Sequence, residues 1–180
     1  MKGAPKLATS RLLGRPITLT DFGRLRGIHS DRRATATLST DGLPFSKAHT
    51  RMSVESWTRH WDEHGYGVWL FHKTDGEFVG YAGIKVASIA EAQGTELLYA
   101  IRPEFWGQNY ATEMSRAALQ FAFESAGLSD IIAFTLRTNL ASRRVMEKCG
   151  FRYEREITHA GLPHVLYRLR ADEFAKSKDG

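Results

Sequence analysis

Residues 96–113 read ELLYAIRPEFWGQNYATE, and this stretch decides how the rest of the chain is interpreted. The apolar run that ends at Ile101 predicts a β-strand, and Pro103 ends it because proline has no backbone N–H to donate. A turn containing Gly107 and Asn109, which tolerate positive φ, leads directly into a helix. The start of such a helix presents backbone N–H groups without intrahelical acceptors, and the helix dipole adds positive potential there. The segment therefore predicts a place where a phosphate group can bind.

Two common phosphate-binding loops do not match this turn. No Gly-Lys-Ser/Thr triplet follows it, as a P-loop requires, and the G-x-G-x-x-G pattern of dinucleotide-binding folds is absent. A glycine two residues before an asparagine also occurs in ordinary connecting turns. The spacing alone leaves open both a ligand of another kind and a turn without a ligand.

The hydrophobic pattern on both sides of this segment alternates between strands and helices. Thr74-Asp75-Gly76 predicts a hairpin turn because Asp-Gly tolerates positive φ. The predicted strands are Ser10–Pro16, Gly67–Lys73, Glu77–Val86, Thr95–Ile101, Ile131–Arg137, a strand from Phe151 onward, and Pro163–Arg170. The predicted helices are Thr20–His29 with Thr20 and Asp21 as caps, a helix from Ser53, Ala111–Ala126 and Ala141–Cys149, while Thr40–Arg51 and Ser88–Gly94 are predicted loops.

This order of elements predicts a single mixed α/β domain. The strands before and after the helix Ala111–Ala126 should lie parallel, joined by a right-handed crossover. A chain of 180 residues with 42% hydrophobic side chains is large enough for one core, and no repeat or low-complexity linker divides it.

Composition narrows the class of protein further. Cys149 is the only cysteine, and the N-terminal residues form no apolar leader, so we expect a cytoplasmic protein. No apolar run approaches the roughly 20 residues that span a bilayer. The net charge of +5 is spread along the chain without a nucleic-acid-binding motif, so we expect neither a membrane nor a nucleic acid as partner.

The segment also fits a longer pattern, E-x-G-Y-x-x-x-P-x-x-W-G-x-G-Y-A-T-E. Matching residues are Glu96, Tyr99, Pro103, Trp106, Gly107, Tyr110, Ala111, Thr112 and Glu113, and a second block downstream comprises Asn139, Ser142, Val145, Glu147, Lys148, Gly150 and Phe151. Together these blocks resemble the GCN5-related N-acetyltransferase (GNAT) family, in particular the branch similar to the ribosomal-protein N-terminal acetyltransferases (RimJ/RimL-like).

The resemblance covers residues 10–170 and leaves 1–9 and 171–180 as terminal extensions. It implies a GNAT fold, in which a mixed central sheet of about seven strands, with flanking helices, holds CoA between a splayed parallel strand pair. The chain departs from the pattern twice, with Asn109 and Leu98 where the branch has glycine. Asn109 can adopt the left-handed conformation at modest cost, so the turn should survive. Leu98 could narrow the pocket beside the pantetheine path.

The implied cofactor is acetyl-CoA. Its pyrophosphate would bind the backbone N–H groups of about Gly107 to Thr112, and its pantetheine arm would lie between the strands Leu97–Ile101 and Ile131–Arg137. Arg102, Arg143 and Arg144 are candidates for phosphate contacts. The alternative for each is a side chain that is simply solvated. The expected cofactor-binding residues are Leu98, Tyr99, Ile101, Trp106, Gly107, Gln108, Asn109, Tyr110, Ala111, Thr112, Asn139 and Arg143.

The resemblance also implies the catalytic residues. Glu96 would take the proton of the amine, with a structural ion pair as the alternative role. A backbone N–H near Leu98 or Tyr99 would stabilise the oxyanion. Ser142 would return a proton to the sulfur, although a serine in the first turn of a helix can also be a cap, and Tyr110 is a weaker rival.

Other polar side chains have simpler interpretations. Cys149 lies on the apolar side of its helix and is expected in the core. The seven histidines form no metal-ligand pattern, so no metal is predicted, and His60 and His64 are expected at the surface. Trp57 and Trp61 are expected as core anchors near an acceptor pocket built from Thr37–Trp61 and His159–His164.

The sequence therefore predicts an acetyl-CoA-dependent N-acetyltransferase acting on a primary amine, of a protein or peptide N-terminus or of a small molecule, as a monomer or homodimer. The alternatives are a non-catalytic acyl-CoA-binding sensor and a basic nucleic-acid binder, which salt-dependent binding would reveal.

Overall fold

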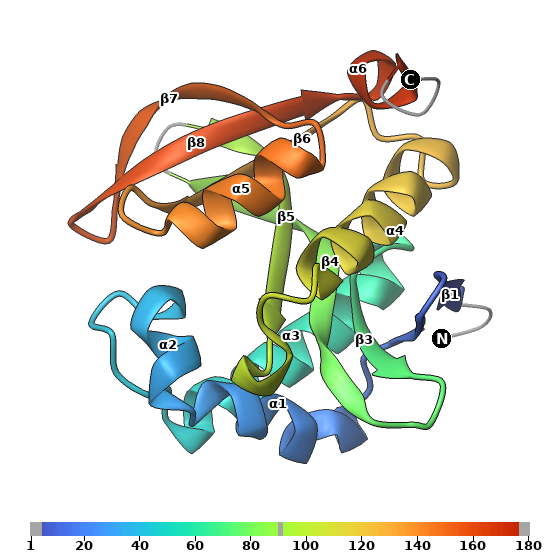
Figure 1. Cartoon of the computed structure of the whole chain (residues 1–180), viewed down its shortest axis with the longest axis vertical. Helices are drawn as coiled ribbons and strands as arrows, with labels where there is room; N and C mark the ends of the chain where they lie inside the picture. Colours follow the sequence, from blue (N-terminus) through green and yellow to red (C-terminus); the bar gives the residue numbers. More distant parts are fainter. Residues whose placement is uncertain (1–4, 90–91, 177–180) are drawn as a thin grey trace.

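The centre of the molecule is a mixed β-sheet. Two of its strands near the middle are parallel and share a single register pair. The computed structural model describes residues 5–89 and 92–176, and its strands follow the order β1-β2-β3-β4-β5-β6-β8-β7 (Figure 1). Their bounds are β1 Leu7–Ala8, β2 Leu12–Pro16, β3 Val68–Lys73, β4 Phe78–Ile89, β5 Ala92–Ile101, β6 Asp130–Leu136, β7 Arg152–His159 and β8 Leu162–Arg170. The expected mixed sheet of about seven strands has eight in the described residues, because the short β1 pairs with β2.

Helices cover this sheet and build the lower part of the molecule in Figure 1. Helix α4 packs against β4 and β5, and α1 packs against α3. The helical bounds are η1 Leu19–Asp21, α1 Phe22–His29, α2 Arg32–Leu38, α3 Lys47–His64, η2 Pro103–Phe105, α4 Tyr110–Glu124, α5 Leu140–Lys148 and α6 Ala171–Lys176. No helix among the described residues is long and apolar enough to cross a membrane.

The region between α1 and α3 differs from the prediction. The expected loop Thr40–Arg51 ends early, because α3 begins at Lys47 instead of Ser53. Ser46 caps this helix, its side chain accepting a hydrogen bond from the His49 N–H at 3.0 Å. Helix α2 was not predicted; Asp31 caps it by accepting from the Arg33 N–H at 2.8 Å. The interior threonines Thr35 and Thr37 give this helix a weak sequence signal because threonine is β-branched.

The hairpin of β3 and β4 agrees with its prediction. The strands pair antiparallel, the Lys73 N–H donates to the Glu77 carbonyl at 2.9 Å, and Gly76 has φ +89°. The predicted polar connection 88–94 is shorter than expected, since β4 runs to Ile89 and β5 starts at Ala92. Residues 90–91 of that connection lie outside the described residues.

The two strands on either side of α4 are parallel, as predicted. In the described residues β5 and β6 share one register pair, Glu96 with Ile132, whereas β5 pairs with β4 from Ala92 to Ile101. From Leu97 onward β5 thus has a partner on one side only, and the two strands diverge. This divergence opens the sheet on one edge of β5.

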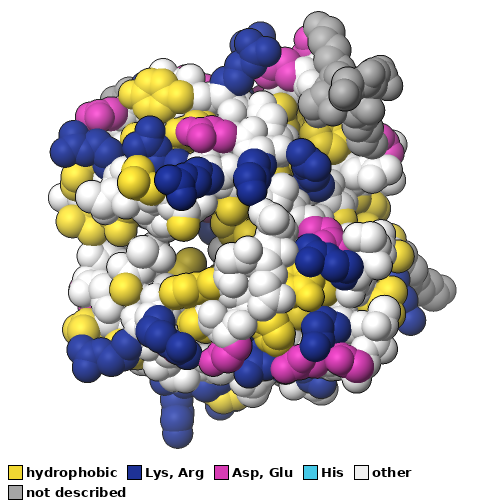
Figure 2. All heavy atoms as spheres, viewed as in Figure 1, with side chains coloured by type: hydrophobic (Ala, Val, Ile, Leu, Met, Phe, Trp, Pro, Cys, Tyr) yellow, Lys and Arg dark blue, Asp and Glu magenta, His cyan; other side chains and the backbone are white. Residues whose placement is uncertain are grey.

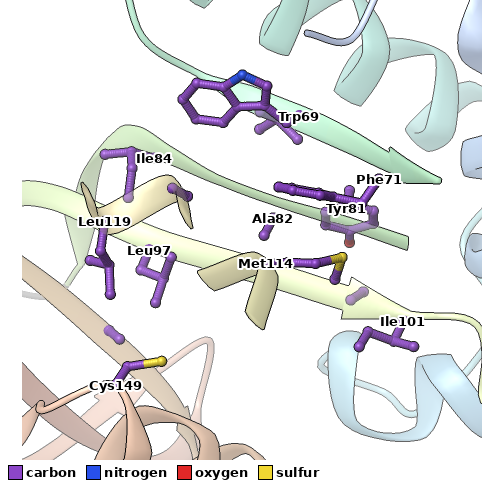
Figure 3. Packing of buried hydrophobic residues seen from close by; sticks show 14 of the residues in the cluster. Trp69, Phe71, Tyr81, Ala82, Ile84, Leu97, Ile101, Met114, Leu119 and Cys149 are labelled. Carbon is purple, nitrogen blue, oxygen red and sulfur yellow. The ribbon is translucent and has the colours of Figure 1, made fainter. Parts of the chain in front are cut away.

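The core fills the space between α4 and the sheet. Met114 and Leu119 of α4 are fully buried and lie against β4 and β5. Figure 3 shows Leu119 near Leu97 and Met114 near Tyr81. Cys149 is also buried, as predicted, and burial raises the pKa of its thiol to about 12. Helix α6, which begins after the predicted domain boundary, joins this packing through Phe174, whose ring centroid lies 5.2 Å from that of Phe123.

Candidate active site

A cleft of about 830 Å³ lies where β5 and β6 diverge. Its floor comes from β5, one wall from the start of α4 and from α5, and the opposite wall from α1, α2 and α3. Figure 2 shows the surface hollowed between the upper part of the molecule and the lower part, with apolar side chains visible inside. The expected site residues that line it are Glu96, Leu98, Tyr99, Ile101, Trp106, Gly107, Asn109, Tyr110, Ala111, Thr112, Asn139 and Ser142.

The turn before α4 has the conformation that its sequence predicts. Gly107 has φ +76°, and Asn109 adopts the left-handed region with φ 62° and ψ 10°. The N–H of Glu113 makes the first intrahelical bond, to the Asn109 carbonyl at 3.1 Å. The N–H groups of residues 110–112 precede that bond, so the helix offers them to an anion at the mouth of the cleft.

The chemistry of this turn fits the phosphates of CoA. Lys148 and Arg144 of α5 both line the cleft, and the Lys148 Nζ reaches the turn, donating to Asn109 Oδ1 at 2.7 Å. The Lys148 ammonium therefore lies beside the N–H groups that begin α4. The unpaired edge of β5 beyond Glu96 supplies backbone groups that suit the amides of pantetheine.

A set of contacts from residues 9–11, which connect β1 to β2, holds the turn in place. Glu113, in the first turn of α4, accepts from Thr9 Oγ1 at 2.6 Å and from Arg11 Nε at 2.8 Å. Arg11 also donates to the Gln108 carbonyl at 3.1 Å and lies 4.3 Å above the Tyr110 ring. Sequence reasoning placed residues 1–9 outside the domain and missed this support, since nothing in the local sequence links Thr9 to a residue 104 positions away.

Glu96 is buried beside one ammonium group. Its side chain is 11% exposed, and its Oε2 lies 3.3 Å from Lys85 Nζ on the neighbouring strand β4. Burial raises the pKa of the Glu96 carboxyl, and the ammonium of Lys85 lowers it in part. The carboxylate in turn adds to the effect of burial that raises the pKa of the Tyr81 phenol. Sequence reasoning did not single out Lys85, because the strand register that pairs it with Glu96 is a tertiary feature.

Ser142 has hydrogen-bond partners at the wall of the cleft. Its Oγ lies 2.8 Å from the hydroxyl of Tyr99, which also donates to the Ser142 carbonyl at 3.0 Å. Asn139 caps α5, its Oδ1 accepting from the Ser142 N–H at 3.1 Å. Burial raises the pKa of the Tyr99 phenol, so this side chain keeps its proton. The sequence pointed to the backbone of Tyr99 and missed its hydroxyl.

Three residues considered for the cofactor site have side chains that bond outside the cleft. The guanidinium of Arg143 donates to Tyr167 Oη at 3.2 Å, and that of Arg102 donates to the Phe78 carbonyl at 3.1 Å. Neither residue lines the cleft, and neither does Gln108, whose Nε2 donates to the Glu104 carbonyl. Arg144 is the one of the three named arginines that does line it.

Rings line the end of the cleft opposite the turn. The rings of Phe45 and His49 stack with centroids 4.2 Å apart, and those of Trp57 and Tyr81 lie 5.1 Å apart. His29 packs at 4.8 Å from Phe45, and burial lowers the pKa of its imidazole to about 4. Residues of both predicted ranges, Thr37–Trp61 and His159–His164, line the cleft, while His29 and Tyr81 lie outside these ranges.

The histidine pair on α3 has one member that is not a surface residue. His60 is half-buried: its Nδ1 lies 2.8 Å from the Tyr66 carbonyl, and its Nε2 accepts from the Val86 N–H at 3.0 Å. It therefore joins α3 to β4 next to Lys85, contrary to the prediction for this residue. Within the described parts of the chain no group of His, Cys, Asp or Glu could hold a metal ion.

Comparisons with known proteins agree with this geometry. Residues 11–152 match the family model described as "Acetyltransferase (GNAT) domain". A curated relative, the FsC-acetyl coenzyme A-N(2)-transacetylase of Aspergillus fumigatus, is 32% identical over 167 residues, which are 83% of this chain and 66% of that protein.

Solved structures share the fold. A GNAT-family acetyltransferase from Bordetella pertussis superposes with a TM-score of 0.80 at 22% identity, covering 91% of this chain and 98% of that one. The ribosomal L7/L12 alpha-N-protein acetyltransferase RimL, solved with coenzyme A, has a TM-score of 0.75 at 16% identity, covering 94% and 99% of the two chains.

Proposed function

Because the chain belongs to the GNAT acetyltransferase family, whose acetyl donor is acetyl-CoA, we propose that it transfers the acetyl group to a primary amine by direct attack on the thioester. The single observation that carries the proposal is the convergence of Glu96, the Tyr99–Ser142 hydroxyl pair and the turn before α4 on one cleft. The name of the curated relative, an N(2)-transacetylase that uses acetyl coenzyme A, supports nitrogen as the acceptor atom.

Acetyl-CoA supplies the activated acetyl group when it is bound. The amine nitrogen forms a bond to the thioester carbonyl carbon, and the carbon–sulfur bond breaks with its electron pair going to sulfur. Two protons must leave the ammonium form of the acceptor: one goes to a base and then to water, and one is returned to the departing sulfur. The protein must therefore provide a proton acceptor and a proton donor within one site.

Glu96 is our proposed base. Its burial raises the carboxyl pKa toward the range in which a carboxylate accepts a proton readily, while Lys85 favours the ionised form that must be present before the reaction. The neighbouring strand β6 diverges from β5 directly after the Glu96–Ile132 pair, so Glu96 lies at the start of the open edge.

The hydroxyl pair of Tyr99 and Ser142 is our proposed donor. Both hydroxyls lie at the wall formed by α5, and each can pass a proton to the other across 2.8 Å. Backbone N–H groups at the start of α4, together with Arg144 and Lys148, would hold the phosphates of CoA. Asn139 orients Ser142 through the cap of α5.

The test is a pair of measurements on purified protein. Calorimetry with acetyl-CoA should give saturable binding, and a thiol-release assay with a panel of amines should give turnover on at least one. In Glu96→Gln we expect acetyl-CoA binding to persist while kcat falls by about a hundredfold or more. Glu55→Gln, an exposed glutamate on α3 outside the cleft, is the matched control and should behave as wild type. Binding without thiol release on any amine would contradict the proposed function.

A further inference from the structure

The pair formed by Lys85 and Glu96 offers two opposite charges at one point of the cleft. The two residues are register partners on β4 and β5, so their side chains lie on the same face of the sheet. Lys85 Nζ and Glu96 Oε2 are 3.3 Å apart, and both residues line the cleft. The Lys85 side chain is 35% exposed, so its ammonium can reach a ligand without leaving Glu96.

This arrangement is complementary to one chemical group. In an α-amino acid, a cationic amine and an anionic carboxylate share one carbon atom. We propose that the acceptor is an α-amino acid, bound with its amine at Glu96 and its carboxylate at Lys85. The inference rests on the proposed function and specifies the substrate class of the same site. Charge-assisted contacts of this kind are the strong hydrogen bonds of a binding site.

The other charges of the cleft support the assignment. Among the described lining residues Glu96 is the one carboxylate. Arg33 is held by Asp31 at 2.7 Å and by Glu104 at 3.0 Å, and Lys148 donates to Asn109 at the phosphate turn. Lys85 is thus the positively charged side chain that lies next to Glu96, the proposed base. A second positive charge on the acceptor would face no carboxylate there, which disfavours polyamines and other polycations.

The rings at the far end of the cleft indicate the side chain of the acceptor. The stacked pair Phe45 and His49 and the pair Trp57 and Tyr81 form an aromatic surface there. Such a surface suits an apolar or planar side chain, because ring contacts add to the burial of apolar area. A phenylalanine-like amino acid therefore fits both the charge pair and the rings.

The experiment compares matched acceptors in the thiol-release assay with acetyl-CoA. L-phenylalanine is compared with L-phenylalaninamide, which lacks the negative charge, with phenethylamine, which lacks the whole carboxylate, and with spermidine, a polycation. We expect kcat/KM for phenylalanine to exceed that for phenylalaninamide by about tenfold, the effect of one hydrogen bond to a charged group. Phenylalanine should also bind the CoA-loaded protein in calorimetry, whereas spermidine should not.

Variants of Lys85 separate recognition from general damage. Lys85→Met should remove most of the preference for phenylalanine over phenylalaninamide, and Lys85→Arg should restore it. Lys6→Met, an exposed lysine outside the cleft lining, is the control and should keep the preference. Melting temperatures of all variants check that the fold is intact.

The outcomes are distinct. Turnover of phenethylamine or spermidine at least equal to that of phenylalanine, or a carboxylate preference that survives Lys85→Met, would overturn this inference and leave the proposed function standing. No thiol release on phenylalanine, with release on another amine of the wider panel, would likewise overturn this inference alone. No thiol release on any amine of the panel, with acetyl-CoA still bound, would contradict the proposed function and this inference with it.

Discussion

At the scale of single residues, Asn109 determines the shape of the phosphate turn. A residue with φ 62° is strained unless it is glycine or asparagine, and β-branched side chains suffer most. We expect Asn109→Gly to keep wild-type stability and acetyl-CoA affinity. Asn109→Val should lower the free energy of unfolding by about 1–2 kcal/mol and weaken acetyl-CoA binding. Urea unfolding and calorimetry measure the two effects, and an Asn109→Val protein equal to wild type in both would contradict the role of the left-handed turn.

The contact between Tyr99 and Ser142 gives a second residue-scale prediction. Because the hydroxyls bond to each other at 2.8 Å, they should act as a unit, and effects of residues that act as a unit do not add. Tyr99→Phe and Ser142→Ala should each lower kcat with acetyl-CoA binding unchanged, and the double variant should be no slower than the slower single variant. Steady-state kinetics of wild type, the two single variants and the double variant complete this double-mutant cycle. A rate unaffected by Ser142→Ala would remove that residue from the mechanism.

At the scale of elements, Glu113 joins the N-terminal strands to the start of α4. Its side chain is 15% exposed and accepts hydrogen bonds from Thr9 and Arg11, so its removal takes the charged acceptor away from both donors. We expect Glu113→Ala to lower the free energy of unfolding by about 1–2 kcal/mol and to weaken acetyl-CoA binding. Glu77→Ala, which removes the exposed ion pair with Lys73, is the comparison and should cost less than about 1 kcal/mol. Equal losses in urea unfolding would argue against the anchoring role.

Elements with strong local signals could be predicted, and the connections between them could not. The β3–β4 hairpin follows from Asp75-Gly76, and α4 follows from its apolar face and the turn before it. Helix α2 was missed because its interior threonines give a weak helical signal and its stability comes from tertiary packing.

The candidate site shows the same division. The phosphate turn and Glu96 could be found in one contiguous segment. The partners that give these residues their environment come from distant positions: Lys85 through strand register, the Tyr99 hydroxyl through α5, and His29 through the packing of α1 on α3. Local spacing carries no information about such contacts, so the sequence alone could not supply them.

At the scale of the whole molecule, burial of His29 between α1 and α3 couples folding to pH. The imidazole is 2% exposed, and its Nδ1 lies 3.2 Å from Thr50 Oγ1. Burial is the main cause that lowers its pKa to about 4, and the charges of His49 and Arg26 add to the effect. The folded state therefore keeps this ring neutral at pH values at which an exposed histidine, with a pKa of about 6.5, is already protonated.

Protonation then favours unfolding as the solution becomes acidic. Because the folded pKa lies below the unfolded one, the contribution of His29 is complete above pH 6.5 and is lost as the pH falls toward 4. Between pH 7 and pH 5 this single group should lower the free energy of unfolding by about 2 kcal/mol. Urea unfolding at both pH values measures the loss. Because the glutamine side chain of His29→Gln cannot be protonated, the pH dependence of this variant should be smaller by that amount. The same pH dependence in both proteins would show that His29 is already protonated, or exposed, in the folded state.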